Sequence, residues 1–545
     1  MSLANSISRQ FPATALICAL AISSILGAWA AHRHTLQYSE YPFGCDSFGY
    51  LQMARQIRQS PDALWTADYH LKYEHTTFLS KALRESNLPV ERWDESVAPH
   101  AHHYFPKADA IGPQYPPGTS LVLAAFPEGK ALSGLNVFVI GMLLALGLGL
   151  IFLAAFKKAW LAATSISLAA LCSLFVVADI GVASYSINAM IVPVVLAIIC
   201  TYLSTWSGDT GWRPGAFAFA AGAFLGLGML IRLPILFLAP GLSILLLPRS
   251  WRGLRNVIRE PLVLFLIGLV CFGVLQVMWH QHRVAGAWHL PTYSGGDTAP
   301  PSLKYVVSNT RFYLSQGGAG ATGHSLVLVL GLILLATHRS ASDRVPGSRR
   351  ILLAVVVTWL IPTAYFLTHR VTTHYYLFPS TIATLWMMAL AFLSFERDSS
   401  LEKSGVSRRG RGLVIAVLAA LVMFLGSKLY WSAPGDPSPD IDPPTIPQEF
   451  REGQPWIWAE MTAGTIVYYA DVPAFKVSFG DRETRHLIYT IAFATGKPQY
   501  LVVDTPTMGM IADEIRSMGG TLELRGEAAY FPYYLIHWPP SGPGR

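Results

Sequence analysis

The sequence predicts a polytopic α-helical membrane protein with a small α/β domain at its C-terminal end. Its 545 residues are 52% hydrophobic and only 13% charged, against about 25% charged residues in an average soluble domain. Apolar runs long enough to cross a bilayer, about 18 residues or more, recur over the first four-fifths of the chain. Towards the C-terminus the pattern changes to short, alternating strand and helix segments.

About eleven apolar segments are candidate membrane-spanning helices. The first resembles a signal peptide, because Ala28-Trp29-Ala30 mimics a cleavage site. Its apolar run of about 20 residues is long for a signal peptide and predicts a retained helix. The fifth and sixth segments are separated only by Arg232, Leu233 and Pro234, so a helical hairpin or a re-entrant pair would also fit there. The segments are 11–31, 131–156, 159–178, 188–206, 215–231, 234–248, 261–281, 324–338, 351–368, 375–395 and 413–431.

The basic residues predict the orientation of the chain. If the N-terminus is cytoplasmic, the Lys and Arg clusters at 157–158, 249–259, 339–350 and 397–411 all fall on one side, as the positive-inside rule requires. The net charge of +7 reflects these loops and does not indicate nucleic-acid binding. We expect an integral protein of a bacterial inner (plasma) membrane, with a cytoplasmic N-terminus and a periplasmic or extracellular C-terminal domain.

The predicted organisation is a transmembrane domain at 1–431, a Pro- and Asp-rich linker at 432–455 and an exoplasmic α/β domain at 456–545. The first exoplasmic loop, 32–130, should carry short helices at Gln52–Arg58 and Ser120–Phe126. A second exoplasmic segment, 282–323, is rich in Gly, Ser and Thr and is predicted to be irregular. In the C-terminal domain we expect strands at 456–459, 474–479, 500–504, 521–524 and 533–537, and helices at 462–469, 483–494 and 508–518.

Asp46 is the first candidate for chemistry. It lies in the sequence Tyr41 to Tyr50 directly after the first apolar run, close to the membrane surface. A carboxylate there could deprotonate an attacking hydroxyl group, hold a metal ion or orient a sugar. Asp is also a favoured helix N-cap, and a cap before a helix at 47–57 remains an alternative.

Several short motifs resemble those of the GT-C superfamily, the polyprenyl-phosphate-sugar-dependent membrane glycosyltransferases that include protein O-mannosyltransferases and aminoarabinose transferases. Asp46-Ser47-Phe48-Gly49-Tyr50, followed by Ala54-Arg55, is similar to the start of the first exoplasmic loop in that superfamily. Tyr115-Pro116-Pro117-Gly118 resembles the segment that ends this loop. Arg232-Leu233-Pro234 resembles an Arg-Pro pair at a helix boundary, and the segment from Thr373 to Pro379 resembles the opening of a late span. The resemblance covers about residues 10–430 and implies that Asp46 is the catalytic base or a neighbour of it.

The resemblance further implies a cationic site for the lipid phosphate that leaves. Arg232 is the foremost candidate, because it interrupts an apolar stretch where an unpaired charge costs about 2.5–3.5 kcal/mol and because guanidinium groups bind phosphate in bidentate fashion. Snorkelling to the membrane interface is its structural alternative. The other predicted substrate-binding residues are Tyr115, Lys107, His369, Arg370, His374 and Tyr375; Arg283 is a further basic residue on the same side.

The sequence departs from the superfamily pattern at two places. A second acid is frequent in the next exoplasmic loop, where this chain has Asn188; Asp179 could substitute for it. His374 stands where an arginine is common. Both departures bear on metal dependence: no metal site is predicted, although a divalent cation is possible. His100, His102 and His103 are close in sequence, but they lack a ligand spacing typical of zinc sites.

The resemblance implies transfer of one sugar from a polyprenyl-phosphate donor to an exoplasmic glycan, lipid or protein acceptor. Two alternatives remain: a ligase or polymerase acting on lipid-linked oligosaccharides, and a transporter or flippase. Transporters usually contain inverted repeats and polar groups in broken midplane helices, whereas here no repeat is evident and the polar residues concentrate in loops.

Overall fold

The structure is a computed structural model. It describes residues 2–36, 40, 42, 44–66, 68–180, 185–206, 213–247, 260–293, 300–315, 318–341, 348–397, 408–432 and 444–544. The chain forms two compact units. The membrane unit comprises Met1–Tyr38, Leu132–Gln276 and Ala299–Pro439, and the loop–tail unit comprises Ser39–Ala131, Val277–Thr298 and Asp440–Arg545.

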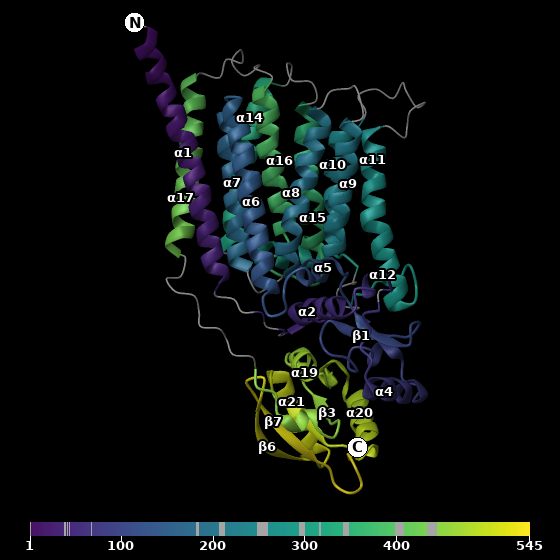
Figure 1. The fold of residues 1–545 in the computed structure, drawn as a ribbon. Coiled ribbons are helices and arrows are strands. Elements are labelled where there is room, and N and C mark those ends of the chain that lie inside the picture. The colour runs from purple at the N-terminus through teal and green to yellow at the C-terminus, as the bar shows by residue number, and fades with distance from the viewer. Residues whose placement is uncertain are drawn as a thin grey trace. The chain divides into compact units, whose positions relative to one another are not determined.

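Ten helices of the described residues are long and apolar enough to cross a membrane, which confirms ten of the predicted segments. Figure 1 shows most of them running side by side. They are α1 (Ser2–Thr35), α6 (Ala131–Phe156), α7 (Trp160–Ile180), α8 (Tyr185–Trp206), α9 (Arg213–Ile231), the continuous run Pro261–Ala285, α14 (Gly318–Ala341), α15 (Ser348–Thr368), α16 (Phe378–Arg397) and α17 (Arg408–Ser432). The run Pro261–Ala285 consists of α11 (Pro261–Leu269), the π-helical turn η4 (Val270–Val274) and α12 (Leu275–Ala285).

The sixth predicted segment is an apolar helix shorter than a membrane span, Leu233–Leu246. It consists of a 3₁₀ turn, η2 (Leu233–Leu238), and α10 (Ala239–Leu246). Arg232 has extended backbone angles after α9, and the following Pro234 has no N–H for a continuing helix. The expected break between the fifth and sixth segments is therefore present.

Helices α7 and α16 form the interior of the membrane unit. Within their spanning windows 94% of the residues are buried, against 28–33% for α1, α6, α14, α15, α17 and Pro261–Ala285. The indole of Trp386 on α16 donates a hydrogen bond to Ser173 Oγ on α7 over 3.1 Å. The less buried helices therefore present the apolar surface that lipid would cover.

Helices α9 and α11 approach so closely that only glycine fits between their backbones. A Cβ atom at Gly222 would lie 1.9 Å from the carbonyl oxygen of Phe265, and one at Gly268 would lie 2.3 Å from that of Phe219. Small residues permit such contact between helices in membranes, where packing drives association.

The C-terminal part of the loop–tail unit contains a five-stranded sheet with strand order β4-β3-β5-β7-β6. Strand β3 pairs in parallel with β4 and β5, whereas β7 pairs antiparallel with β5 and β6. The strands are β3 (Trp456–Trp458), β4 (Ala474–Phe475), β5 (Gln499–Val502), β6 (Thr521–Ala528) and β7 (Phe531–His537), and the helices are α19 (Ala463–Ala470), α20 (Arg482–Ala494) and α21 (Pro506–Ser517). The predicted α/β pattern is confirmed, although β4 is shorter than predicted because the chain enters a 3₁₀ turn, η7 (Val477–Phe479), after Lys476.

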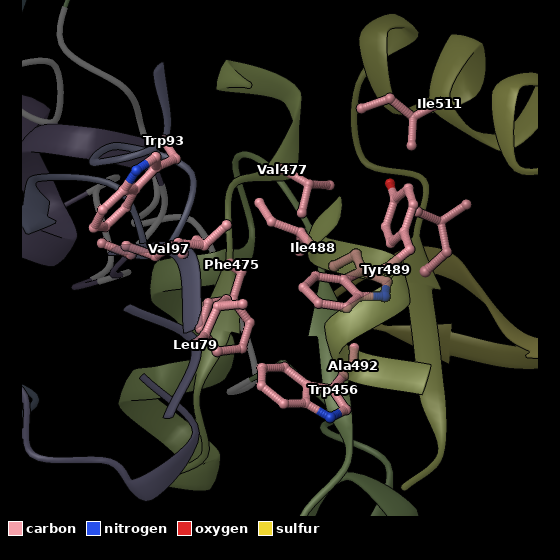
Figure 2. Close-up of a cluster of buried hydrophobic side chains, with 14 of the residues drawn as sticks. Leu79, Trp93, Val97, Trp456, Phe475, Val477, Ile488, Tyr489, Ala492 and Ile511 are labelled. Atoms are coloured by element: carbon pink, nitrogen blue, oxygen red, sulfur yellow. The ribbon is translucent and has the colours of Figure 1, made fainter. Parts of the chain in front are cut away.

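The sheet shares a single hydrophobic core with the segment that follows the first membrane helix. Figure 2 shows Leu79, Trp93 and Val97 from that segment beside Trp456 and Phe475 of the sheet. Leu79 lies on α4 (Glu74–Glu85). All five side chains are fully buried, so these two parts of the sequence form one folded body.

Two predictions for the loop segments require correction. The short interfacial helix expected at 52–58 is part of a longer helix, α2 (Gly44–Gln59), and most of its residues are buried because α5 (Gly118–Ala124) and α19 pack against it. The segment expected to be irregular contains a helix, α13 (Val306–Leu314). Of the predicted linker, residues 433–443 lie outside the described residues, and the described remainder includes a short helix, α18 (Gln448–Arg451).

Candidate active site

Asp46 lies in the first turn of α2 and is half-buried. The helix begins at Gly44, so Asp46 is inside the helix and is not its N-cap. A carboxylate in the first turn interacts favourably with the partial positive charge of the helix N-terminus.

The hydroxyl group of Tyr115 donates a hydrogen bond to Asp46 Oδ1 over 2.5 Å. Tyr115 is buried, and its ring stacks on that of Tyr50 with centroids 4.7 Å apart. Burial, and then the negative charge of Asp46, raise the pKa of Tyr115 well above its usual value. The phenol therefore stays protonated and remains a donor to the carboxylate.

Cys45 and Gln114 complete the surroundings of this pair. The Sγ atom of Cys45 lies 3.1 Å from the Tyr115 hydroxyl, and Gln114 Nε2 donates to the same sulfur over 3.1 Å. Burial, and then Asp46, raise the pKa of the Cys45 thiol to about 11, so the thiol is neutral. Sequence reasoning missed both residues, since neither type signals a role without its neighbours.

The arrangement leaves Asp46 Oδ2 without an assigned protein donor in the described residues. A half-buried carboxylate with one oxygen held by a phenol and the other available is suited to accept a proton from a hydroxyl group. Asn188 stands where a second acid is frequent in the GT-C superfamily. It is fully buried, and its amide donates a hydrogen bond to Asn136 Oδ1 over 2.9 Å. Asp179 is exposed near the end of α7.

Arg232, in the membrane unit, is half-buried among polar and aromatic groups. Its Nη1 donates to Ser186 Oγ over 2.9 Å, and its guanidinium carbon lies 5.3 Å and 5.1 Å from the ring centroids of Tyr375 and Tyr376. The predicted residues Arg232 and Tyr375 thus lie together. Aromatic faces attract a cation, and a guanidinium group binds anions through hydrogen bonds from its edge.

The remaining predicted residues are distributed more widely. His369 is buried, and its Nδ1 accepts a hydrogen bond from the backbone of Val371 over 3.2 Å, as expected of a residue that orders its own loop. Arg370 and His374 are exposed, the latter with its ring 5.2 Å from that of Tyr375. In the loop–tail unit, Lys107 is exposed, and Arg283 donates to the carbonyl oxygen of Thr66 over 2.6 Å.

Within the described residues, no three His, Cys, Asp or Glu side chains come together as metal ligands. His103 Nε2 lies 2.6 Å from the carbonyl oxygen of Thr292, and His102 Nδ1 lies 3.2 Å from that of His100. These contacts occupy one ring nitrogen of His102 and one of His103 with backbone groups.

Comparison with known proteins places residues 114–363 within the sequence model of glycosyltransferase family 87. None of the curated proteins compared with the chain matches it significantly in sequence. The solved structure of ArnT from Cupriavidus metallidurans bound to undecaprenyl phosphate is 13% identical to the chain, with a TM-score of 0.50 and coverage of 94% of this chain and 97% of that one. The same protein in the apo state gives 13% identity, a TM-score of 0.40 and the same coverage.

A third solved structure is the archaeal oligosaccharyltransferase AglB from Archaeoglobus fulgidus, in complex with an inhibitory peptide and a dolichol-phosphate. It is 12% identical, with a TM-score of 0.38 and coverage of 96% of this chain and 74% of that one. At these identities, the likeness to the undecaprenyl-phosphate complex of ArnT establishes the fold alone. The resemblance seen in the sequence is confirmed: the chain is an integral membrane protein with the fold of the GT-C glycosyltransferases, and its residues 114–363 match glycosyltransferase family 87.

Proposed function

We propose that the chain transfers a single sugar from a polyprenyl-phosphate carrier to an acceptor on the exoplasmic side of the membrane. The family match supports sugar transfer. The fold is shared with ArnT, which has been solved with undecaprenyl phosphate bound, and this supports a lipid-linked donor. The observation that carries the proposal is the half-buried Asp46 carboxylate, which Tyr115 holds at the start of α2.

In the proposed reaction Asp46 is the general base. The acceptor hydroxyl gives its proton to the free carboxylate oxygen while its own oxygen forms a bond to the anomeric carbon of the donor. The bond from that carbon to the phosphate oxygen breaks, and its electron pair leaves with the polyprenyl phosphate. A direct displacement of this kind inverts the anomeric configuration. Positioning of the reactants and a general base supply much of the rate.

Arg232 is proposed to stabilise the departing phosphate. Its guanidinium group holds a positive charge beside Ser186, Tyr375 and Tyr376, and charge that develops on a leaving group is stabilised best by groups already in place. We count the shorter apolar helix Leu233–Leu246 as a further crossing beside the ten longer helices. On that count the clusters of basic residues at 157–158, 249–259, 339–350 and 397–411 share one side with the N-terminus, which supports a cytoplasmic N-terminus and an exoplasmic Asp46 and C-terminal domain. No step is assigned to a metal ion.

Asp46→Asn tests the proposal in purified protein supplied with labelled polyprenyl-monophosphate sugars. The amide keeps the shape of the side chain but cannot take up the proton, so the transfer rate should fall by about 10²- to 10⁴-fold. Asp62→Asn, which changes an exposed acid in the same loop, should transfer at the wild-type rate. Arg232→Gln should chiefly slow cleavage of the bond between the anomeric carbon and the lipid phosphate, with a smaller effect on acceptor binding.

Wild-type turnover in Asp46→Asn would contradict the role of Asp46. Turnover only with polyprenyl-diphosphate oligosaccharides would favour a ligase or polymerase. Movement of the labelled lipid across a proteoliposome bilayer without sugar transfer would favour a flippase. An alkaline phosphatase reporter that is active only outside the cytoplasm, fused to the C-terminus, tests the proposed orientation.

A further inference from the structure

A buried lysine side chain lies between the sheet and the first-loop segment. Burial lowers the pKa of its ammonium group, and the nearby carboxylates, Glu95 foremost, act in the opposite direction. Lys476, at the end of β4, is only 4% exposed, and its ammonium nitrogen lies 4.4 Å from the centroid of the Phe479 ring. Its backbone N–H donates to the carbonyl oxygen of Ala98 over 3.2 Å. Among the described residues, its ammonium group makes no hydrogen bond or ion pair. A buried ammonium without such partners is costly.

Other buried polar atoms without a partner lie around the same turn. They are His100 Nε2, His102 Nε2 and Ser96 Oγ. The ring of His100 meets that of Phe479 edge-on at 5.7 Å, and Ser96 Oγ would lie 3.0 Å from a Cβ atom at Gly480. Unpaired buried polar atoms are few in folded proteins, so their grouping with Lys476 indicates a site that a ligand completes. We call Lys476, His100, His102 and Ser96 the Lys476 cluster.

The Lys476 cluster is joined to the helix that carries Asp46. The charge of Lys476 acts on Cys45, which contacts the Tyr115 hydroxyl bonded to Asp46. The ring of His102 packs on that of Phe48, two residues from Asp46 on the same helix, with centroids 5.3 Å apart. The sheet domain and the base therefore lie on one continuous structure.

Helix α19 of the C-terminal domain fixes this connection. The backbone N–H of Gly44 donates to the carbonyl oxygen of Met461 over 3.1 Å, and Thr465 Oγ1 donates to that of Pro42 over 2.8 Å. A Cβ atom at Gly464 would lie 2.3 Å from Phe48 Cγ, so the two helices are in direct contact. The placement of Lys476 relative to Asp46 is thus set by packing.

The composition of the cluster indicates the chemistry of its ligand. The ammonium donates, and the two histidines each have a free ring nitrogen. Burial is the main reason that the pKa of both histidines is lowered to about 3, and Lys476 adds to the effect at His100. Both rings are therefore neutral. The carboxylates of Asp94, Glu95 and Glu460 also act on Lys476 and would oppose a phosphate. Hydroxyl groups both donate and accept, and the half-exposed Phe479 ring offers an apolar face.

We propose that the Lys476 cluster binds hydroxyl groups of a sugar on the acceptor, so that the C-terminal domain takes part in acceptor selection. This inference rests on the proposed glycosyl transfer. It assigns Lys476 as an acceptor-binding residue, distinct from the base and from the groups that would bind the donor phosphate.

Lys476→Met tests the inference in the purified full-length chain. The acceptors are octyl glucoside, octyl mannoside and octyl galactoside, and hydrolysis of the labelled polyprenyl-phosphate sugar by water is measured beside transfer. Loss of a charged hydrogen bond should raise the acceptor KM by about tenfold or more, with donor KM and hydrolysis unchanged. Because methionine removes an unpaired buried charge, the unfolding temperature should stay the same or rise. Lys497→Met, which changes a lysine already bonded to Gln454, should leave the acceptor KM unchanged.

An unchanged acceptor KM in Lys476→Met would overturn the inference. So would a lower unfolding temperature accompanied by equal losses of hydrolysis and transfer, because both point to a purely structural lysine. If the wild-type chain neither transfers nor hydrolyses any polyprenyl-phosphate sugar, the proposed function fails. Saturation-transfer NMR with methyl glycosides then still decides the binding claim: a signal that the wild type gives and Lys476→Met loses supports it, and its absence in both overturns it.

Discussion

At the scale of single residues, the pairing of Asp46 with Tyr115 is the central feature. The phenol donates to one carboxylate oxygen and leaves the other available. Its ring is held by Tyr50 on one side and by Tyr293 with centroids 5.8 Å apart. The neighbouring rings therefore hold the Tyr115 hydroxyl group in place, and its hydrogen bond fixes the orientation of the Asp46 carboxylate.

Tyr115→Phe should keep the aromatic stack but remove this donor. We expect the transfer rate to fall about tenfold or more, since hydrogen bonds to charged groups contribute about 1.5–3 kcal/mol, while the unfolding temperature changes little. The comparison is Tyr104→Phe, which removes a similar hydrogen bond to Asp109, of 2.7 Å, in the same unit. Equal effects of the two substitutions on the rate would argue against a special role for Tyr115.

The two partners could be named from the sequence, but their contact could not. Asp46 stands out as an acid directly after a membrane helix, and Tyr115 through a motif that resembles one in a known superfamily. Nothing local in the sequence indicates that the two side chains meet across 69 positions. Nothing in the sequence indicates that Lys476 is buried, because a lysine after a strand is usually exposed. Only the packing of the folded chain reveals its burial.

At the scale of elements, strongly patterned segments were predicted well. The membrane helices and the strands β3, β5 and β7 follow from hydropathy and alternation. Helix α2 was predicted too short and at the surface, because its burial comes from α5 and α19, which lie far away in sequence. Helix α13 was missed since it is short and lies in a segment rich in Gly, Ser and Thr.

Strand β1 (His102–Phe105) and the residues before it make the loop–tail unit sensitive to acid. Burial, chiefly, lowers the pKa of His100 and His102 to about 3 and that of His103 to about 4. The unfolded chain binds protons below pH 6.5, whereas the folded chain does so only near pH 3–4. The contribution of these histidines to the free energy of unfolding is therefore complete above pH 6.5. It decreases as the pH falls from 6.5 towards 3, by about 2 kcal/mol per histidine at pH 5.

The unfolding temperature should accordingly be lower at pH 5 than at pH 7.5, as measured by differential scanning fluorimetry. His102→Gln should reduce this difference, because the amide does not take up a proton in the unfolded state. His289→Gln, which alters an exposed histidine of the same unit, should leave the difference as it is. An equal unfolding temperature at both pH values would contradict the expectation.

At the scale of the whole molecule, the C-terminal domain is part of the body that contains Asp46. Leu79, Trp93 and Val97 pack against Trp456 and Phe475 in one buried cluster (Figure 2). The sequence presents these as two segments with separate patterns, and no local signal predicts their common core. Removal of a domain that shares its core with the first loop should therefore destabilise that loop.

A chain that ends after Ser432 should therefore lose the folded state of its first loop. Removal of the sheet exposes the apolar side chains of Leu79, Trp93 and Val97 to water, at a cost of about 1.5–3 kcal/mol for each large side chain. Brief trypsin digestion should then cut at Lys81 and Arg84 on α4 far faster than in the full-length protein. Equal cleavage rates would show that the first loop folds by itself.

Because its two parts are far apart in the sequence, this shared core cannot form until the end of the chain has been synthesised. Helix α4 and the residues around Trp93 leave the ribosome long before the sheet that covers them. About 350 residues separate the two, which at about 5–20 residues per second corresponds to a delay of roughly 20–70 seconds. During that time the apolar side chains of Leu79, Trp93 and Val97 stay uncovered while the remaining membrane helices are synthesised. We therefore expect that cells making this protein need a chaperone that protects these side chains until the sheet is made. Faster translation of the later helices should then improve the yield of folded protein.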